Sequence, residues 1–160
     1  MKYYEKLSGT RFLWITFTAT LICTIAFKFV AARFDLVLID KIIDPDQTRA
    51  AISTMSDSQR TVHTWVTGTL DVLYPLVYGA FFIGTAYRFI PKIGTWLAAP
   101  IFILVPVDLA EGMVQILGLT GVVDWLNAKF FLTSLKNVLF GYGLLLTASG
   151  WAAWISSKVR

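Results

Sequence analysis

Charged residues are scarce in this sequence. Asp, Glu, Lys and Arg make up only 15% of its 160 residues, whereas 56% are hydrophobic, and a soluble domain ordinarily has about a quarter of its residues charged. The apolar residues stand in long blocks, and the basic residues stand at the edges of those blocks. The net charge of +4 therefore matches the charge pattern of membrane topology and excludes a basic face that binds nucleic acid.

Cysteine and histidine are almost absent. Cys23 and His63 are the single residues of their types, so an internal disulfide and a structural zinc site are both excluded. The sequence also lacks a nucleophile elbow, a phosphate-binding P-loop and a histidine-rich metal motif. We therefore predict neither a resident metal ion nor a cofactor.

Four apolar blocks are long enough to cross a membrane. A hydrocarbon core of about 30 Å needs roughly 20 helical residues, and the blocks cover residues 12–32, 67–89, 95–117 and 131–154. Each must be helical, because lipid offers no partner to an open backbone N–H or C=O group. We predict an all-α polytopic membrane protein, with residues 1–160 forming a single transmembrane domain that folds as a four-helix bundle.

The distribution of basic residues predicts the orientation of these spans. One side carries a single acid, Glu5, and most of the basic residues, while the other side mixes acids with bases such as Asp124 and Lys129 in the third loop. By the positive-inside rule, we expect both termini on the cytoplasmic side of the membrane. The basic residues on the cytoplasmic side are Lys2, Lys6, Arg11, Arg88, Lys92, Lys158 and Arg160.

The first span raises the question of a signal peptide. Its apolar stretch is longer than the apolar region of a signal peptide, and Lys28 interrupts its end. We therefore expect a retained helix.

The loop of residues 33–66 is the only long segment outside the predicted spans. Asp44-Pro45-Asp46-Gln47 combines a capping Asp, a Pro at the first helical position and a Gln at the third, which predicts a short helix over residues 45–55. Ser56-Asp57-Ser58-Gln59 repeats this signal and predicts a second helix that runs from Asp57 into the second span. We expect a helical extracytoplasmic cap, or a lid over a site between the helices.

Ionisable residues interrupt three of the apolar blocks, although an unpaired charge in a membrane costs several kcal/mol. Asp71 lies near the outer end of the second span, and Asp108 and Glu111 lie in the outer half of the third. Lys136 lies about one helical turn inside the outer end of the fourth span. Three separate spans thus bring charges to similar depths, which predicts one shared polar site in the outer half of the bilayer.

Helical spacing adds further residues to this site. Asp71, Tyr74 and Tyr78 share one face of their helix, and Asp108, Glu111 and Gln115 share a face of theirs. Asn137 adjoins Lys136, and the preceding loop can bring basic side chains above the acids. The candidate ligand-binding or polar-network residues are Arg60, His63, Asp71, Tyr74, Tyr78, Asp108, Glu111, Gln115, Lys136 and Asn137.

Three hypotheses for this site stay open. The first is a structural network that fixes helix register, in which Asp71 or Asp108 pairs with Lys136 and Glu111 reaches the interface. The second is binding or transport, through a pocket open to the outer leaflet for a lipid headgroup, a small amphiphile or a cation. Three carboxylates against one lysine leave spare negative charge, which favours a cationic ligand or a protonated carboxyl group.

The third hypothesis is an intramembrane enzyme that acts on a lipid or amphiphile. Asp71 or Asp108 would be its general base, and Lys136 or His63 would be the acid or electrophilic partner. The partners predicted from the sequence are the lipid bilayer and a lipid or amphiphile, and the sequence is compatible with a monomer or a dimer.

Several short motifs lie within residues 56–140: Gln59-Arg60 with His63, Asp71-Val72-Leu73-Tyr74-Pro75, Tyr78-Gly79, Asp108-Leu109-Ala110-Glu111 and Leu135-Lys136. With these motifs, this part of the chain resembles an uncharacterised family of small bacterial four-helix integral membrane proteins with no known activity. Family members carry Asn where this chain has Gly112, and an aromatic residue where it has His63. The resemblance implies the four-helix fold and the shared polar site, and it implies no activity.

Overall fold

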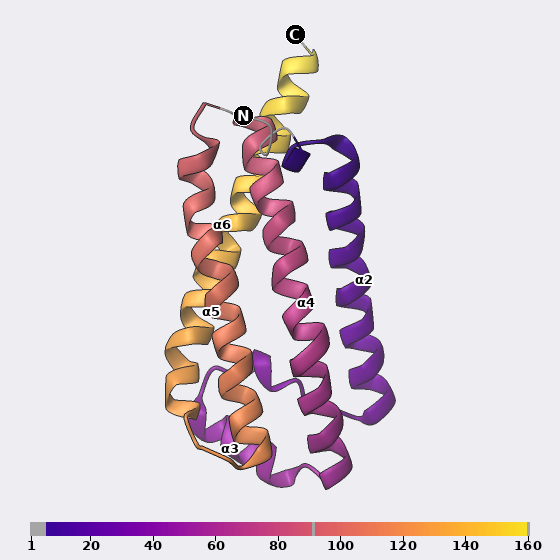
Figure 1. Cartoon of the computed structure of the whole chain (residues 1–160), viewed down its shortest axis with the longest axis vertical. Coiled ribbons are helices and arrows are strands. Elements are labelled where there is room, and N and C mark those ends of the chain that lie inside the picture. Colours follow the sequence, from indigo (N-terminus) through magenta and orange to yellow (C-terminus); the bar gives the residue numbers. More distant parts are fainter. Residues whose placement is uncertain (1–5, 91, 160) are drawn as a thin grey trace.

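The computed structural model describes residues 6–90 and 92–159. Within these ranges the chain is all-α and has no strand. Four long helices alternate in direction and form the bundle of Figure 1: α2 (Thr10–Phe34), α4 (Asp57–Phe89), α5 (Gly94–Thr120) and α6 (Leu126–Val159). Each of the four is long and apolar enough to cross a membrane. The prediction of an all-α chain with four such helices is confirmed.

The helices pack around a central pair, α4 and α5. α2 packs against α4, and α6 packs against both α5 and α4. One apolar core joins all four helices, with Leu13 of α2, Phe82 of α4, Leu104 of α5 and Leu146 of α6 among its buried members. In the part of the chain that the structure describes, α2 and α6 form no extensive interface with each other. The side of the bundle between α2 and α6 is therefore its less tightly packed side.

The helix starts in the long loop follow the capping signals of the sequence. The short helix α3 covers Pro45–Thr54, and the Asp44 carboxylate accepts the Gln47 backbone N–H at 2.8 Å. The side chain of Ser56 accepts the backbone N–H of Gln59 at 3.3 Å, and the Gln59 side chain returns a bond to the Ser56 backbone. This capping box lets α4 begin at Asp57, ahead of its predicted membrane span, as the sequence indicates.

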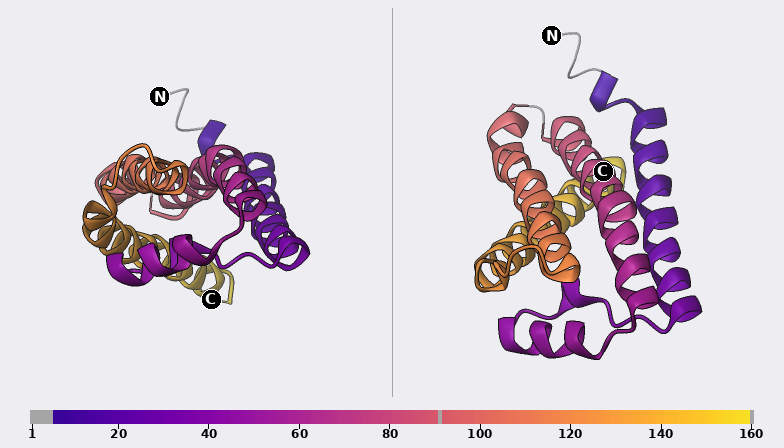
Figure 2. Two further views of the ribbon diagram at one scale, coloured as in Figure 1. Left: turned by 90° about the horizontal axis from the view of Figure 1, so that it is seen from below. Right: turned by 60° about the horizontal axis from the view of Figure 1, so that its bottom comes forward.

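The segment between α2 and α3 turns into the end of the bundle. Its single turn of 3-10 helix, η1 (Ile39–Lys41), has Ile39 fully buried. Ile39 belongs to a second apolar core with Ile52 of α3, Val114 of α5 and Leu126 of α6. Figure 2 shows this segment and α3 lying across the end of the four long helices. The loop is thus a packed cap and not a loose connection.

Helix α6 begins earlier than its predicted span. It starts at Leu126, whose backbone N–H is accepted by the Asp124 carboxylate at 3.0 Å, whereas the hydropathy pattern starts at residue 131. The assignment of Lys129 to the third loop was therefore wrong, because the capped first turns of α6 include it.

The two ends of the bundle carry different parts of the chain. The first described residues and the end of α6 lie at one end, and α3 lies at the other (Figure 1). Lys2, Glu5 and Arg160, on which the predicted orientation partly rests, lie outside the described residues.

Candidate functional site

Helix α5 supplies two of the three acids of the predicted polar site, Asp108 and Glu111. Asp108, Glu111 and Gln115 follow one another at helical spacing, so all three point from α5 toward the interior, where they are 4%, 0% and 1% exposed. Buried polar groups need partners, because the apolar interior offers none. The partners of Asp108 and Glu111 come from α4 and α6, whereas Gln115 donates to Glu111 within α5.

Glu111 is the centre of a closed network, which we name the Glu111 cluster: Glu111, Gln115, Lys129, Thr133 and Lys136. One carboxylate oxygen, Oε1, accepts hydrogen bonds from Thr133 Oγ1 at 2.6 Å and Gln115 Nε2 at 3.1 Å. The other oxygen, Oε2, forms an ion pair with the Lys136 amine. Glu111 therefore does not reach the interface, as one hypothesis expected, because its partners bury it completely.

Lys129 is the residue of this cluster that sequence reasoning missed. Its side chain is fully buried, its Nζ lies 3.4 Å from Glu111 Oε1, and it donates to Thr133 Oγ1 at 3.2 Å. It also donates to the backbone carbonyl of Ile42, which ties the segment between η1 and α3 to the cluster. The spacing of Lys129, Thr133 and Lys136 on one helical face was the signal that could have found it.

Asp108 joins the Glu111 cluster to the neighbouring space. Its Oδ2 accepts a hydrogen bond of 2.5 Å from the Tyr78 hydroxyl, and its Oδ1 lies 3.3 Å from the Lys136 amine. Lys136 thus lies between two carboxylates, on Asp108 and Glu111, with its side chain 13% exposed. The predicted convergence of charges from α5 and α6 is what the structure shows.

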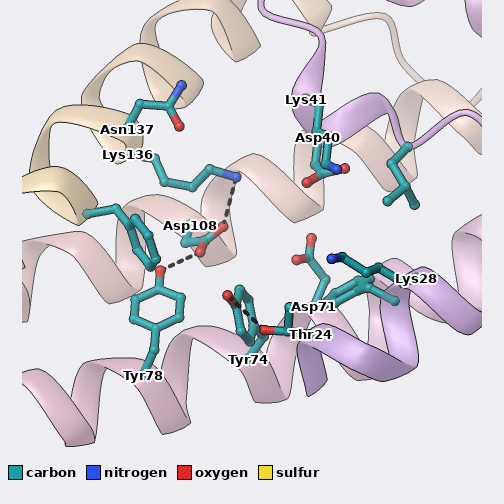
Figure 3. Close-up of a pocket in the computed structure, with 13 residues that line it drawn as sticks. Thr24, Lys28, Asp40, Lys41, Asp71, Tyr74, Tyr78, Asp108, Lys136 and Asn137 are labelled. Atoms are coloured by element: carbon teal, nitrogen blue, oxygen red, sulfur yellow. Dashed lines mark hydrogen bonds and ion pairs between the residues drawn. The ribbon is translucent and has the colours of Figure 1, made fainter. Parts of the chain in front are cut away.

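A cavity of 410 Å³ adjoins Asp108 and Lys136 on the side between α2 and α6. It draws residues from α2, η1, α4, α5 and α6, and Figure 3 shows their side chains pointing into a common space. Six of the predicted site residues line it, and Lys136 is one of them. The charged and polar residues of the lining are Thr24, Lys28, Asp40, Lys41, Asp71, Tyr74, Tyr78, Asp108, Lys136 and Asn137.

Asp71 is the carboxylate of α4 that points into this cavity (Figure 3). Among the described residues it has neither a hydrogen bond nor an ion pair within 4.0 Å. On its other side it faces α5 at Gly112, where an added methyl group would lie 3.6 Å from Asp71 Oδ2. Because glycine offers no side-chain donor there, the carboxylate of Asp71 is left to the cavity.

Aromatic rings form one wall of the cavity. Phe27 and Tyr74 meet with ring centroids 5.6 Å apart, Tyr74 and Tyr78 at 5.1 Å, and Tyr78 and Phe140 at 5.1 Å. All four residues line the cavity, so a row of rings crosses it from α2 through α4 to α6. Such a wall can contact both hydrocarbon and a cation.

The charge balance of the lining differs from the sequence expectation. Three aspartates, Asp40, Asp71 and Asp108, face three lysines, Lys28, Lys41 and Lys136. In the Glu111 cluster, Lys129 adds a further positive charge beside Glu111. The spare negative charge expected from three carboxylates against one lysine is therefore offset, because distant parts of the chain bring lysines to the same place.

Two predicted residues do not join the acids. His63 is 3% exposed, and its Nε2 accepts the backbone N–H of Ile39 at 3.3 Å, while its Nδ1 lies 3.3 Å from Thr67 Oγ1. It therefore fastens η1 to α4. Arg60 lines a separate cavity of 240 Å³ at the α3 end, with Arg49 and Asp124. The expectation that either residue meets the carboxylates was wrong.

A third set of charges lies on the surface at the same end. Arg49 of α3 forms ion pairs with Asp46 at 2.7 Å and Asp124 at 2.8 Å, and it donates to Asn127 at 2.9 Å. The guanidinium of Arg49 and the backbone N–H of Leu126 hold the pKa of the Asp124 carboxyl below its usual range. These bonds attach α3 to the start of α6.

Comparison with known proteins adds no further constraint on this site. Neither the protein-family models, the curated proteins nor the solved structures include a match to this chain. The interpretation of the site therefore rests on its geometry.

Proposed function

We propose that this chain is a multi-pass protein of the bacterial cell membrane that binds the polar headgroup of a lipid or small amphiphile in the cavity beside Asp71. In this proposal both termini are cytoplasmic and the cavity lies in the outer half of the bilayer. The Glu111 cluster holds the helices in register, and the cavity is the functional site.

The outer surface of the bundle supports insertion into lipid. Only 11% of the most apolar 18-residue window of α2 is buried. Trp14, Ile22 and Phe29 of that helix are 58%, 60% and 68% exposed. Contiguous exposed apolar surface of this extent is costly in water, whereas acyl chains cover it without cost.

One observation carries the binding proposal: Asp71 has no partner among the described residues and faces a cavity of 410 Å³, whereas Glu111 on the neighbouring helix has a partner at each of its carboxylate oxygens. If Asp71 served only to fix helix register, a direct partner would be expected. A cavity of this size is at the lower end of the range of about 300–1,000 Å³ that is typical of small-molecule sites. It suits a headgroup and not a complete two-chain lipid.

The route to the cavity follows from the packing. The cavity is lined by Thr24, Phe27 and Lys28 of α2 and by Lys136, Asn137 and Phe140 of α6, and these helices share no extensive interface. The cap formed by residues 35–44 covers the site from the α3 end and contributes Asp40 and Lys41. Access from the side, out of the lipid leaflet, is thus the route that we propose.

The test uses a variant that fills the cavity without changing charge. Thr24→Phe adds a ring to the cavity wall, and Thr18→Phe adds the same ring at an exposed position of α2 outside the lining. Native mass spectrometry of the purified proteins should find a bound lipid or amphiphile in the parent chain and in Thr18→Phe but not in Thr24→Phe. Equal retention by both variants would end the proposal. Conversion of added lipids into products of new mass would favour the enzyme hypothesis instead.

The topology has its own test. A reporter that is active only outside the cytoplasm, inserted near Gln47, should give signal, while the same reporter after the C-terminus should be silent. The opposite pattern would reverse the proposed orientation.

A further inference from the structure

The cavity lining is an equal mixture of opposite charges, and this limits the ligand. Asp40, Asp71 and Asp108 face Lys28, Lys41 and Lys136. A ligand with one net charge of either sign would leave an uncompensated charge in a site of low dielectric constant, which is unfavourable. A ligand that carries one positive and one negative group adds no uncompensated charge.

The charges that remain available are of both signs. Asp108 and Lys136 are engaged with each other, with Tyr78 and with Glu111. Asp71 has no ion pair, and neither do Lys28 and Lys41, in the described ranges 6–90 and 92–159. Asp40 has no ion pair there either, so the cavity presents two free carboxylates and two free amines, which come from α2, η1 and α4.

We infer that the cavity binds a zwitterionic headgroup that carries an ammonium and a phosphate, with the ammonium at Asp71 and the phosphate at Lys28 and Lys41. This inference rests on the proposed function, because it names the ligand class of the same site. Tyr74 lies one helical turn from Asp71, so its ring can contact the ammonium beside the carboxylate. Two lysine amines can donate to separate oxygens of one phosphate.

The position of the lysines favours this assignment over a purely cationic ligand. In Figure 3, Lys28 of α2 and Lys41 of η1 lie on the same side of the cavity as Asp71, whereas Lys136 lies toward Asp108. A lone ammonium at Asp71 would thus be repelled by two amines, and the carboxylate of Asp40 offsets only one of them. A phosphate on the same molecule turns this repulsion into attraction.

The ligand chemistry has two sources, a phospholipid headgroup and a free phosphoethanolamine or phosphocholine. The experiment compares three amphiphiles by native mass spectrometry of the intact purified chain in detergent: phosphatidylethanolamine, anionic phosphatidylglycerol and a cationic alkyl trimethylammonium. A titration with free phosphoethanolamine forms a second arm. Phosphatidylethanolamine should be retained about tenfold better than either competitor, since each charged hydrogen bond in a partly buried site contributes that order of affinity.

The variants separate the two poles of the ligand. Asp71→Asn should weaken the binding of phosphatidylethanolamine about tenfold, because the partner of the ammonium is lost. Binding of phosphatidylglycerol, which has no ammonium, should be unchanged or tighter. Lys41→Gln should weaken the binding of both phospholipids, and binding of the cationic amphiphile should be unchanged or tighter. Asp57→Asn and Lys6→Gln, exposed positions outside the cavity, serve as the matched charge controls.

The outcomes are distinguishable from those of the proposed function. One outcome is that all three amphiphiles bind, that Asp71→Asn has no effect, and that Thr24→Phe abolishes binding. This outcome would overturn the assignment of a zwitterionic ligand and would still support the cavity as a binding site. Preference for the cationic amphiphile would also overturn the zwitterion. Loss of any difference between Thr24→Phe and Thr18→Phe would end both proposals. Binding of free phosphoethanolamine that depends on Asp71, with no lipid retained, would support the same chemistry from the soluble source.

Discussion

Two polar regions lie side by side between the helices, and they use the same residue types differently. In the Glu111 cluster, two lysines, a threonine and a glutamine surround one carboxylate that is fully buried. In the cavity, Asp71 has no direct partner within residues 6–90 and 92–159 and faces 410 Å³ of space. A saturated carboxylate can only hold the helices together, whereas an unsaturated one beside a space can exchange partners. The Glu111 cluster thus fits the structural hypothesis, and the cavity beside Asp71 fits the binding hypothesis.

Asp108 and Lys136 stand on the boundary between the two regions. Lys136 pairs with Glu111 on one side and with Asp108 on the other, and both Asp108 and Lys136 line the cavity. A ligand that moves Lys136 would therefore also change its ion pair with Glu111. Four variants, in order of expected effect, test how far the two regions are separate.

The largest effect is expected from Glu111→Gln. Removal of this charge leaves Lys129 buried without its ion-pair partner, and breaking a buried pair in this way costs about 3–5 kcal/mol. The measurement is denaturant unfolding in detergent micelles, followed by circular dichroism. The double variant Glu111→Leu with Lys129→Met removes both charges and should recover most of the loss. A loss for the single variant no larger than that of an exposed position would mean that the cluster is hydrated and not closed.

Asp108→Asn should have an intermediate effect of about 1–3 kcal/mol. The asparagine can still accept the Tyr78 hydroxyl, and Lys136 keeps Glu111, so only the contact between positions 108 and 136 is weakened. Because Asp108 also lines the cavity, both the free energy of unfolding and the amount of co-purified ligand should fall. A change in only one of these two measurements would assign Asp108 to one region and break the idea of a shared boundary.

Asp71→Asn should change the free energy of unfolding by no more than about 0.5 kcal/mol, as for a substitution that breaks no direct contact. Binding of phosphatidylethanolamine should nevertheless weaken about tenfold. The comparison with Glu111→Gln under the same conditions is the sharpest test of the difference between the two regions. A loss of stability as large as that of Glu111→Gln would place Asp71 in the structural network instead.

The smallest effect is expected at the surface, from Asp124→Asn. Because Arg49 lowers the pKa of Asp124 in the folded protein, this carboxylate stabilises the fold above its unfolded pKa, and the contribution disappears as the pH falls through the lower folded pKa. The difference in melting temperature between parent and variant should therefore be small at neutral pH and absent in acid. Since both partners are solvent-exposed, added salt should also reduce the difference. A difference that grows as the pH falls would contradict this assignment.

The elements of the fold could largely be predicted from residues that act locally. The capping patterns at Asp44 and Ser56 predict where α3 and α4 begin, because a cap involves residues only a few positions apart. The four apolar blocks predict the four long helices, because lipid or a buried core requires a helix of a certain length. The spacing of Asp108, Glu111 and Gln115 predicts that they share an inward face, which they do.

The partners of the acids were harder to predict. Hydropathy favoured a span that starts at residue 131, so Lys129 was interpreted as a loop residue, although it is buried in α6 against Glu111. Arg60 and His63 were expected to meet the acids from the loop above them. In the structure the segment 35–44 folds into the end of the bundle. His63 therefore accepts the backbone N–H of Ile39 in η1 and does not meet the acids.

By itself, the sequence determined the helices, their caps, and the prediction that charges at similar heights share one interior. These follow from short-range hydrogen bonding and from the cost of leaving charges in an apolar medium. Only the tertiary structure decided which carboxylate is saturated and which is free. That outcome depends on where Lys28, Lys41 and Lys129 arrive from distant parts of the chain, and on the absence of a side chain at Gly112 beside Asp71.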